Sequence, residues 1–142
     1  MKKINVGRVL LGGLVAGLVL NIGEFLLNGV ILANDMKADM ETHRIQEPGA
    51  TFFVNVTVAT FVLGIVIVYL YAAIRPQFGA GPKTAICAGA LAWFFVYVYT
   101  GVIYGSMGLF SLKPLLIGAV WGLVEFSLGA IAGAKLYKDA EG

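Results

Sequence analysis

Four long apolar runs dominate the sequence, at residues 6–32, 52–74, 84–104 and 115–134, separated by segments rich in charges, glycine and proline. A helix needs about 20 apolar residues to cross the roughly 30 Å of hydrocarbon in a bilayer, and each run reaches that length. Only 13% of the 142 residues are charged, whereas soluble domains carry about 25%. The sequence therefore predicts an all-α, polytopic membrane protein in which residues 1–142 form a single four-helix transmembrane bundle, surrounded mainly by the lipid bilayer.

The basic residues are distributed unevenly between the two ends of the predicted spans. One end carries Lys2, Lys3, Arg8, Arg75, Lys83, Lys135 and Lys138, and the other carries Lys37, Arg44 and Lys113. Because Lys and Arg are enriched in cytoplasmic segments, we expect both termini in the cytoplasm and the polar loop 33–51 outside. A short helix in that loop is expected to begin at a capping residue, Asn34 or Asp35, and to end at Pro48 and Gly49.

Small and polar residues recur at helical spacing in the first and fourth spans. In the first span they are Gly13, Gly17, Asn21, Glu24 and Asn28. In the fourth span they are Gly118, Gly122, Glu125, Gly129 and Gly133. Residues three or four apart share a helix face, and stripes of small residues let helix backbones approach closely. We therefore expect these glycines to pack against other helices and both glutamates to face the interior of the bundle.

The two glutamates are predicted to lie at a similar depth, roughly 12 and 15 Å from the outer ends of their helices at about 1.5 Å per residue. An ionised carboxylate at such a depth costs about 3 kcal/mol, so we expect at least one of them to be protonated at neutral pH. Polar side chains of the other two spans are expected to complete an aromatic-walled pocket in the outer half. The candidate ligand- or proton-binding residues are Glu24, Glu125, Asn21, Asn28, Asn55, Tyr97 and Thr100. These side chains could instead serve only as hydrogen bonds between helices.

The sequence lacks the patterns on which most enzymes and metalloproteins depend. It has no nucleophile–base arrangement and no phosphate-binding loop, and Cys87 and His43 are its only cysteine and histidine. We therefore expect no enzymatic activity, no metal and no cofactor. The net charge of +2, with basic residues at helix ends, also argues against nucleic acid as a partner.

Several segments resemble a group of uncharacterised bacterial four-helix membrane proteins; they are RVLLGGLVAG (8–17), NIGEFLLNG (21–29), LYAAIRPQFGAGPK (70–83) and WGLVEF (121–126). This resemblance implies a bacterial cytoplasmic (inner) membrane and assigns no activity. The chain also resembles, more loosely, the small multidrug resistance transporters, which are dimers of short four-helix chains that exchange protons for cationic drugs. Glu24 corresponds to their first-helix glutamate by position in the helix, whereas Glu125 has no counterpart there.

Two functions agree with these features. The first is a carrier or binding protein for a small apolar or cationic molecule, which Glu24 and Glu125 would bind or exchange for protons. The second is an accessory subunit of a larger membrane complex, such as a respiratory or photosynthetic assembly, because glycine-striped helices suit packing between other subunits. A homodimer is compatible with either.

Overall fold

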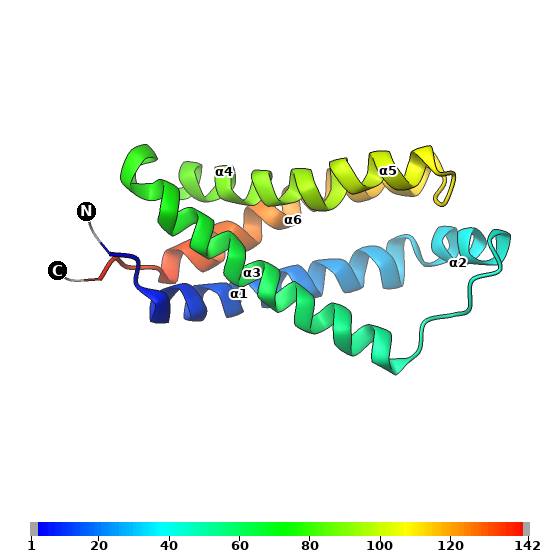
Figure 1. Ribbon diagram of the computed structural model, residues 1–142, viewed down its shortest axis with the longest axis horizontal. Helices are drawn as coiled ribbons and strands as arrows, with labels where there is room; N and C mark the ends of the chain where they lie inside the picture. Colours follow the sequence, from blue (N-terminus) through cyan, green and yellow to red (C-terminus); the bar gives the residue numbers. More distant parts are fainter. Residues whose placement is uncertain (1–2, 141–142) are drawn as a thin grey trace.

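The computed structural model describes residues 3–140, and every regular element in that range is helical. The first span consists of α1 (Val6–Leu26) and a π-helical turn, η1 (Leu27–Ile31), and is followed by the short helix α2 (Ala33–Thr42). The second span is α3 (Ala50–Phe78), and the fourth is α6 (Leu112–Leu136). The third span consists of α4 (Pro82–Trp93), the π-helical segment η2 (Phe94–Tyr99) and α5 (Thr100–Ser106). All four spans are long and apolar enough to cross a membrane, so the predicted fold class is confirmed (Figure 1).

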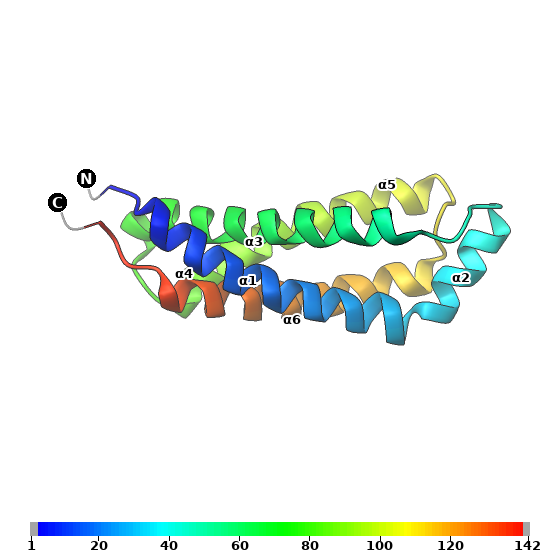
Figure 2. The ribbon, with the colours of Figure 1, turned by 90° about the horizontal axis from the view of Figure 1, so that it is seen from below.

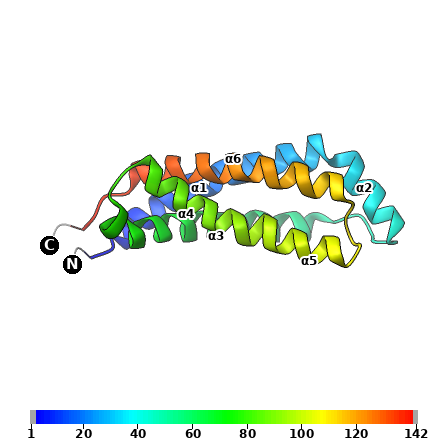
Figure 3. The same cartoon turned by 90° about the horizontal axis from the view of Figure 1, so that it is seen from above.

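Towards α2 the spans form two layers, with α1 and α6 in one and α3 and α5 in the other (Figure 2). At the other end α1 lies beside α3, and α4 lies beside α6. Both described ends of the chain lie at one end of the bundle, here called the terminal end, and α2 lies at the opposite end, the α2 end (Figure 3). Helix α3 lies beside α4 near the terminal end and diverges from α5 towards the α2 end (Figure 1). Consequently the residues from Thr51 to Ala59 are all exposed, whereas Thr60 and Gly64 are buried.

Local sequence accounts for several helix boundaries. Asn5 caps α1, because its side-chain oxygen accepts a hydrogen bond from the backbone N–H of Arg8 at 3.1 Å. Gly79 ends α3 with a φ of 85°, a conformation that glycine adopts without strain. Pro82 begins α4 at the first helical position, where a missing N–H costs no hydrogen bond. The span predicted to end at residue 74 continues to Phe78, because Pro76 lies in the last turn and removes only one backbone bond.

Close packing at the terminal end depends on small residues. The backbones of α1 and α3 meet where Gly64 lies against Gly13 and Gly17. On an adjacent face of α1, Gly12 lies against Gly133 of α6. All six glycines named from the sequence stripes are buried at helix contacts; they are Gly13, Gly17, Gly118, Gly122, Gly129 and Gly133. Large buried side chains such as Leu20 and Phe126 fill the space between these crossings.

The short helix α2 differs from its prediction at both ends. It begins at Ala33, directly after the π-helical turn, with Leu32 at the N-cap position, so the predicted cap at Asn34 or Asp35 is wrong. It ends at Thr42 rather than at Pro48, because the backbone turns at Arg44, whose φ is 55°. Side chains then fix α2 to the start of α6. Asp39 accepts hydrogen bonds from the Ser111 hydroxyl at 2.9 Å and the Ser111 N–H at 3.2 Å, and Asp35 pairs with Lys113 at 3.1 Å.

Candidate binding site between the first, third and fourth spans

Glu24 is the centre of a hydrogen-bonded cluster that joins the first and third spans. The hydroxyl of Tyr97, in η2, donates to Glu24 Oε1 at 2.5 Å. The side-chain amide of Asn28, one turn after Glu24, donates to Glu24 Oε2 at 2.8 Å. Both carboxyl oxygens therefore have partners, which offsets the cost of placing this group inside the bundle. Three of the residues predicted from the sequence are thus in direct contact.

Glu125 belongs to the same region but has a different environment. Only 5% of the residue is exposed, and its carboxyl lies against Gly23, so closely that a side chain at that position would collide with it. Gly23 precedes Glu24 in the chain, so the Glu125 carboxyl lies against α1 close to the level of Glu24. However, neither carboxyl oxygen of Glu125 has a partner in hydrogen-bond geometry among the residues that the structure describes.

Glycines of α6 make room for the Tyr97 ring. The ring lies over Gly118 and Gly122, and a Cβ at Gly122 would come within 2.5 Å of it. Its edge also contacts the ring of Phe126, with centroids 5.7 Å apart. One turn earlier, the indole N–H of Trp93 donates to the backbone carbonyl of Ala119 at 2.7 Å, which fixes α4 against α6. The direction of the Tyr97 hydroxyl towards Glu24 is therefore determined by packing as well as by the hydrogen bond.

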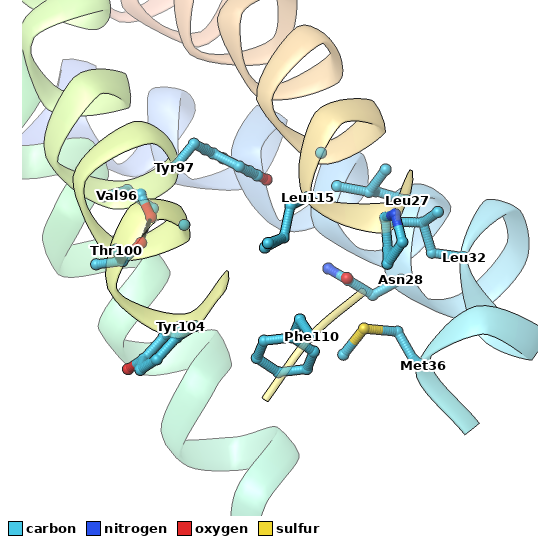
Figure 4. A pocket seen from close by; sticks show the side chains of 13 residues that line it. Leu27, Asn28, Leu32, Met36, Val96, Tyr97, Thr100, Tyr104, Phe110 and Leu115 are labelled. Atoms are coloured by element: carbon cyan, nitrogen blue, oxygen red, sulfur yellow. Dashed lines mark hydrogen bonds between the residues drawn. The ribbon is translucent and has the colours of Figure 1, made fainter. Parts of the chain in front are cut away.

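A crevice opens beside this cluster towards the α2 end, with a volume of about 150 Å³ (Figure 4). Tyr97 and Asn28 belong to its lining, and Glu24 lies behind them. Around the rest of the lining, aromatic and aliphatic side chains come from α2, α5, the connection to α6 and α6 itself. The complete lining is Leu27, Asn28, Leu32, Met36, Val96, Tyr97, Thr100, Gly101, Tyr104, Phe110, Pro114, Leu115 and Gly118. The crevice is thus an apolar, aromatic space, and the Glu24 carboxyl lies behind the Tyr97 and Asn28 side chains of its wall.

Both π-helical segments described in the chain contribute to this crevice, η1 through Leu27 and Asn28 and η2 through Val96 and Tyr97. A π-helical turn widens the helix and leaves backbone carbonyls poorly paired, and such turns are frequent at functional sites. In η2 a side chain forms a hydrogen bond with one such carbonyl, because the Thr100 hydroxyl donates to the backbone oxygen of Val96. Neither π-helical segment is predicted from the sequence.

The remaining predicted residues are divided between the crevice and other places. Thr100 lines the crevice. Asn21 donates to the backbone carbonyls of Gly17, at 2.9 Å, and Thr57, at 3.4 Å, and so connects α1 to α3. Asn55 does not join the others, because it lies exposed on the part of α3 that diverges from the bundle. The expectation that α3 contributes Asn55 to the pocket is therefore not met by the structure.

The four apolar spans and the two-layered packing define a multi-pass helical membrane protein. Comparisons of the chain with protein-family models, with curated proteins and with solved structures found no match. A carboxyl group held by a phenol and an amide, as Glu24 is here, can bind a cation or take up a proton.

Proposed function

We propose that the protein binds, and as a carrier moves, a small apolar or cationic molecule in the crevice, with Glu24 as its acidic group. The single observation that carries this proposal is the Glu24 carboxyl, which Tyr97 and Asn28 hold directly behind the lining of an aromatic cavity. Small-molecule sites are typically apolar cavities with a few polar groups in fixed positions. An aromatic lining that includes Tyr97, Tyr104 and Phe110 also suits a cation, because ring faces attract positive charge.

The charge balance around the two glutamates supports a cationic ligand. Within residues 3–140, neither Glu24 nor Glu125 forms an ion pair, whereas Arg75 pairs with Asp139 and Lys113 with Asp35 at the ends of the bundle. An ionised carboxylate inside a membrane is costly unless a positive charge neutralises it. A bound cation would supply that charge, and a proton taken up by Glu24 would neutralise the carboxylate when the cation leaves. This arrangement supports a carrier that exchanges a cation for a proton.

Glu24→Gln is expected to weaken binding of benzyltrimethylammonium by at least about tenfold, because the amide keeps the shape of the carboxyl and removes its charge. Binding to the parent protein should also weaken as the pH falls, since protonation neutralises the same group. The measurement is isothermal titration calorimetry in detergent at several pH values. Neopentylbenzene, an uncharged ligand of the same shape, should bind the parent and the variant equally. If the cation bound the two proteins equally at every pH, Glu24 would be structural only.

We further propose that the terminal end faces the cytoplasm of a bacterial inner membrane and that α2 lies outside. The excess of Lys and Arg at the terminal end supports this orientation. In a Cys87→Ala background, a thiol reagent that does not cross membranes should label Glu41→Cys in intact cells and Lys138→Cys only after lysis. Labelling in the opposite order would reverse the proposed topology.

An accessory subunit of a membrane complex is the second candidate, and the divergence of α3 favours it. The exposed stretch from Thr51 to Ala59 includes Phe52, Phe53 and Val54, each more than half exposed. Such a segment suits contact with a neighbouring chain as well as with lipid. Purification in a mild detergent would recover partner chains in a fixed ratio if this function is correct, and a lone monomer or homodimer if it is not.

A further inference from the structure

A second concave region, here called the groove, lies on the other side of the contact between α1 and α6. Its volume is about 680 Å³, and it shares no lining residue with the crevice. Its walls include Ile22 and Leu26 of α1 and Val120 and Val124 of α6, which are between 41% and 71% exposed. Because these residues belong to membrane spans, the groove opens sideways towards lipid.

Two polar side chains of α6 interrupt this apolar lining, Trp121 and, one turn later, Glu125. The Trp121 N–H and both Glu125 oxygens are buried and have no partner in hydrogen-bond geometry within the described residues. The indole N–H is near enough to the carboxyl to interact with it, but the pair does not meet that geometry. Buried polar groups without partners are rare in folded proteins, since each loses its hydrogen bonds to water. The lining of the groove therefore includes a donor and an acceptor that have no hydrogen-bond partner among the described residues.

We propose that the groove binds a membrane-dissolved lipophile that carries a hydroxyl group. A hydroxyl oxygen can accept a hydrogen bond from the Trp121 N–H while its proton is donated to the Glu125 carboxyl. An ammonium group cannot accept the first bond, a carbonyl cannot donate the second, and an alkane can do neither. The hydroxyl group is thus the simplest one that satisfies both side chains.

The shape and position of the groove agree with such a ligand. Its volume lies within the roughly 300–1,000 Å³ of typical small-molecule sites. Its opening towards lipid gives a route of entry that does not pass through water, and its exposed aliphatic side chains suit the tail of the ligand. The inference does not rest on the function proposed for the crevice, because no groove residue lines the crevice.

Fluorescence quenching of Trp121 tests this proposal directly. The chain has two tryptophans, so a Trp93→Phe protein in phosphatidylcholine vesicles reports on Trp121 alone. A bromine atom quenches indole fluorescence on contact, and 2-bromododecan-1-ol places it beside the hydroxyl group. We expect this alcohol to quench saturably at a membrane concentration about five- to tenfold lower than 2-bromododecane, which lacks the hydroxyl. A difference of that size corresponds to one or two added hydrogen bonds.

Substitutions of Glu125 separate hydrogen bonding from charge. Glu125→Gln should keep the preference for the alcohol, because an amide both donates and accepts, whereas Glu125→Leu should abolish it. Gel filtration and circular dichroism check that each variant is folded. If Glu125→Leu does not fold, the comparison of alcohol and alkane quenching in the parent and in Glu125→Gln still tests the proposal. Equal quenching by alcohol and alkane in the parent would overturn the proposal. So would stronger quenching by 2-bromododecan-1-amine that Glu125→Gln removes, because that result would indicate a cation site.

Discussion

Gly64→Ala is expected to lower the free energy of unfolding by about 1–3 kcal/mol, the usual range for adding a methylene to a well-packed core. The added Cβ would lie 2.5 Å from the carbonyl oxygen of Gly13 and 2.7 Å from the Cα of Gly17. Both are backbone atoms, so no side chain can rotate away, and α1 and α3 must separate. The loss is measured by unfolding the protein from mild detergent with increasing dodecyl sulfate, followed by circular dichroism.

Gly101→Ala provides the matched control, since it also adds one methyl group within a membrane span. Its Cβ would meet only Leu115, at 3.9 Å, an ordinary van der Waals distance. Alanine is also the better helix former, so this variant should be neutral or slightly more stable than the parent. Equal effects of the two substitutions would show that the contact between α1 and α3 is looser than the structure indicates.

Gly122→Ala is expected to be nearly as destabilising and, in addition, to impair the crevice. Its Cβ would come within 2.5 Å of the Tyr97 ring, which is enclosed on another side by Phe126. The ring must move away from α6, and its hydroxyl then loses the hydrogen bond to Glu24. We expect a loss of about 1–3 kcal/mol in stability together with weaker binding of benzyltrimethylammonium.

Tyr97→Phe separates the two parts of this effect. It removes the hydroxyl and leaves the ring in place, so it should reproduce the loss of the hydrogen bond without the collision at Gly122. Tyr99→Phe, at a residue that is 54% exposed, should change neither stability nor binding. Suppose that Gly122→Ala left binding unchanged while Tyr97→Phe weakened it. The Tyr97 ring would then have room to shift while keeping its hydrogen bond to Glu24.

The four spans could be predicted from the sequence because hydrophobic length alone decides whether a helix crosses a bilayer. Contact between Glu24, Asn28 and Tyr97 agrees with the prediction that polar residues of different spans meet, since spacing fixes which face of a helix they occupy. Spacing does not fix the angle at which helices cross. The prediction that Asn55 lies in the pocket is therefore not met. Asn55 lies near the start of α3, in the exposed part of the helix that is splayed away from the bundle (Figure 1).

Two other features were missed for different reasons. Gly64 was not singled out, although Thr60 and Gly64 have the spacing of a small-residue stripe and would have indicated the contact with α1. The π-helical segments η1 and η2 have no comparable signal in their own residues. Segments such as Phe94–Tyr99 are apolar and suit an ordinary helix equally well, so the widened turn reflects packing between spans.

The turn η1 also sets the rotation of α2 about the axis of the first span, because α2 follows it with only Leu32 between them. Removing one residue from Leu27–Ile31 would restore ordinary helical spacing and rotate everything after it by about 100°. Met36 would then leave the crevice, and Asp39 would no longer reach Ser111. The fold should thus tolerate changes of length after Thr42 far better than a single insertion or deletion within Leu27–Ile31.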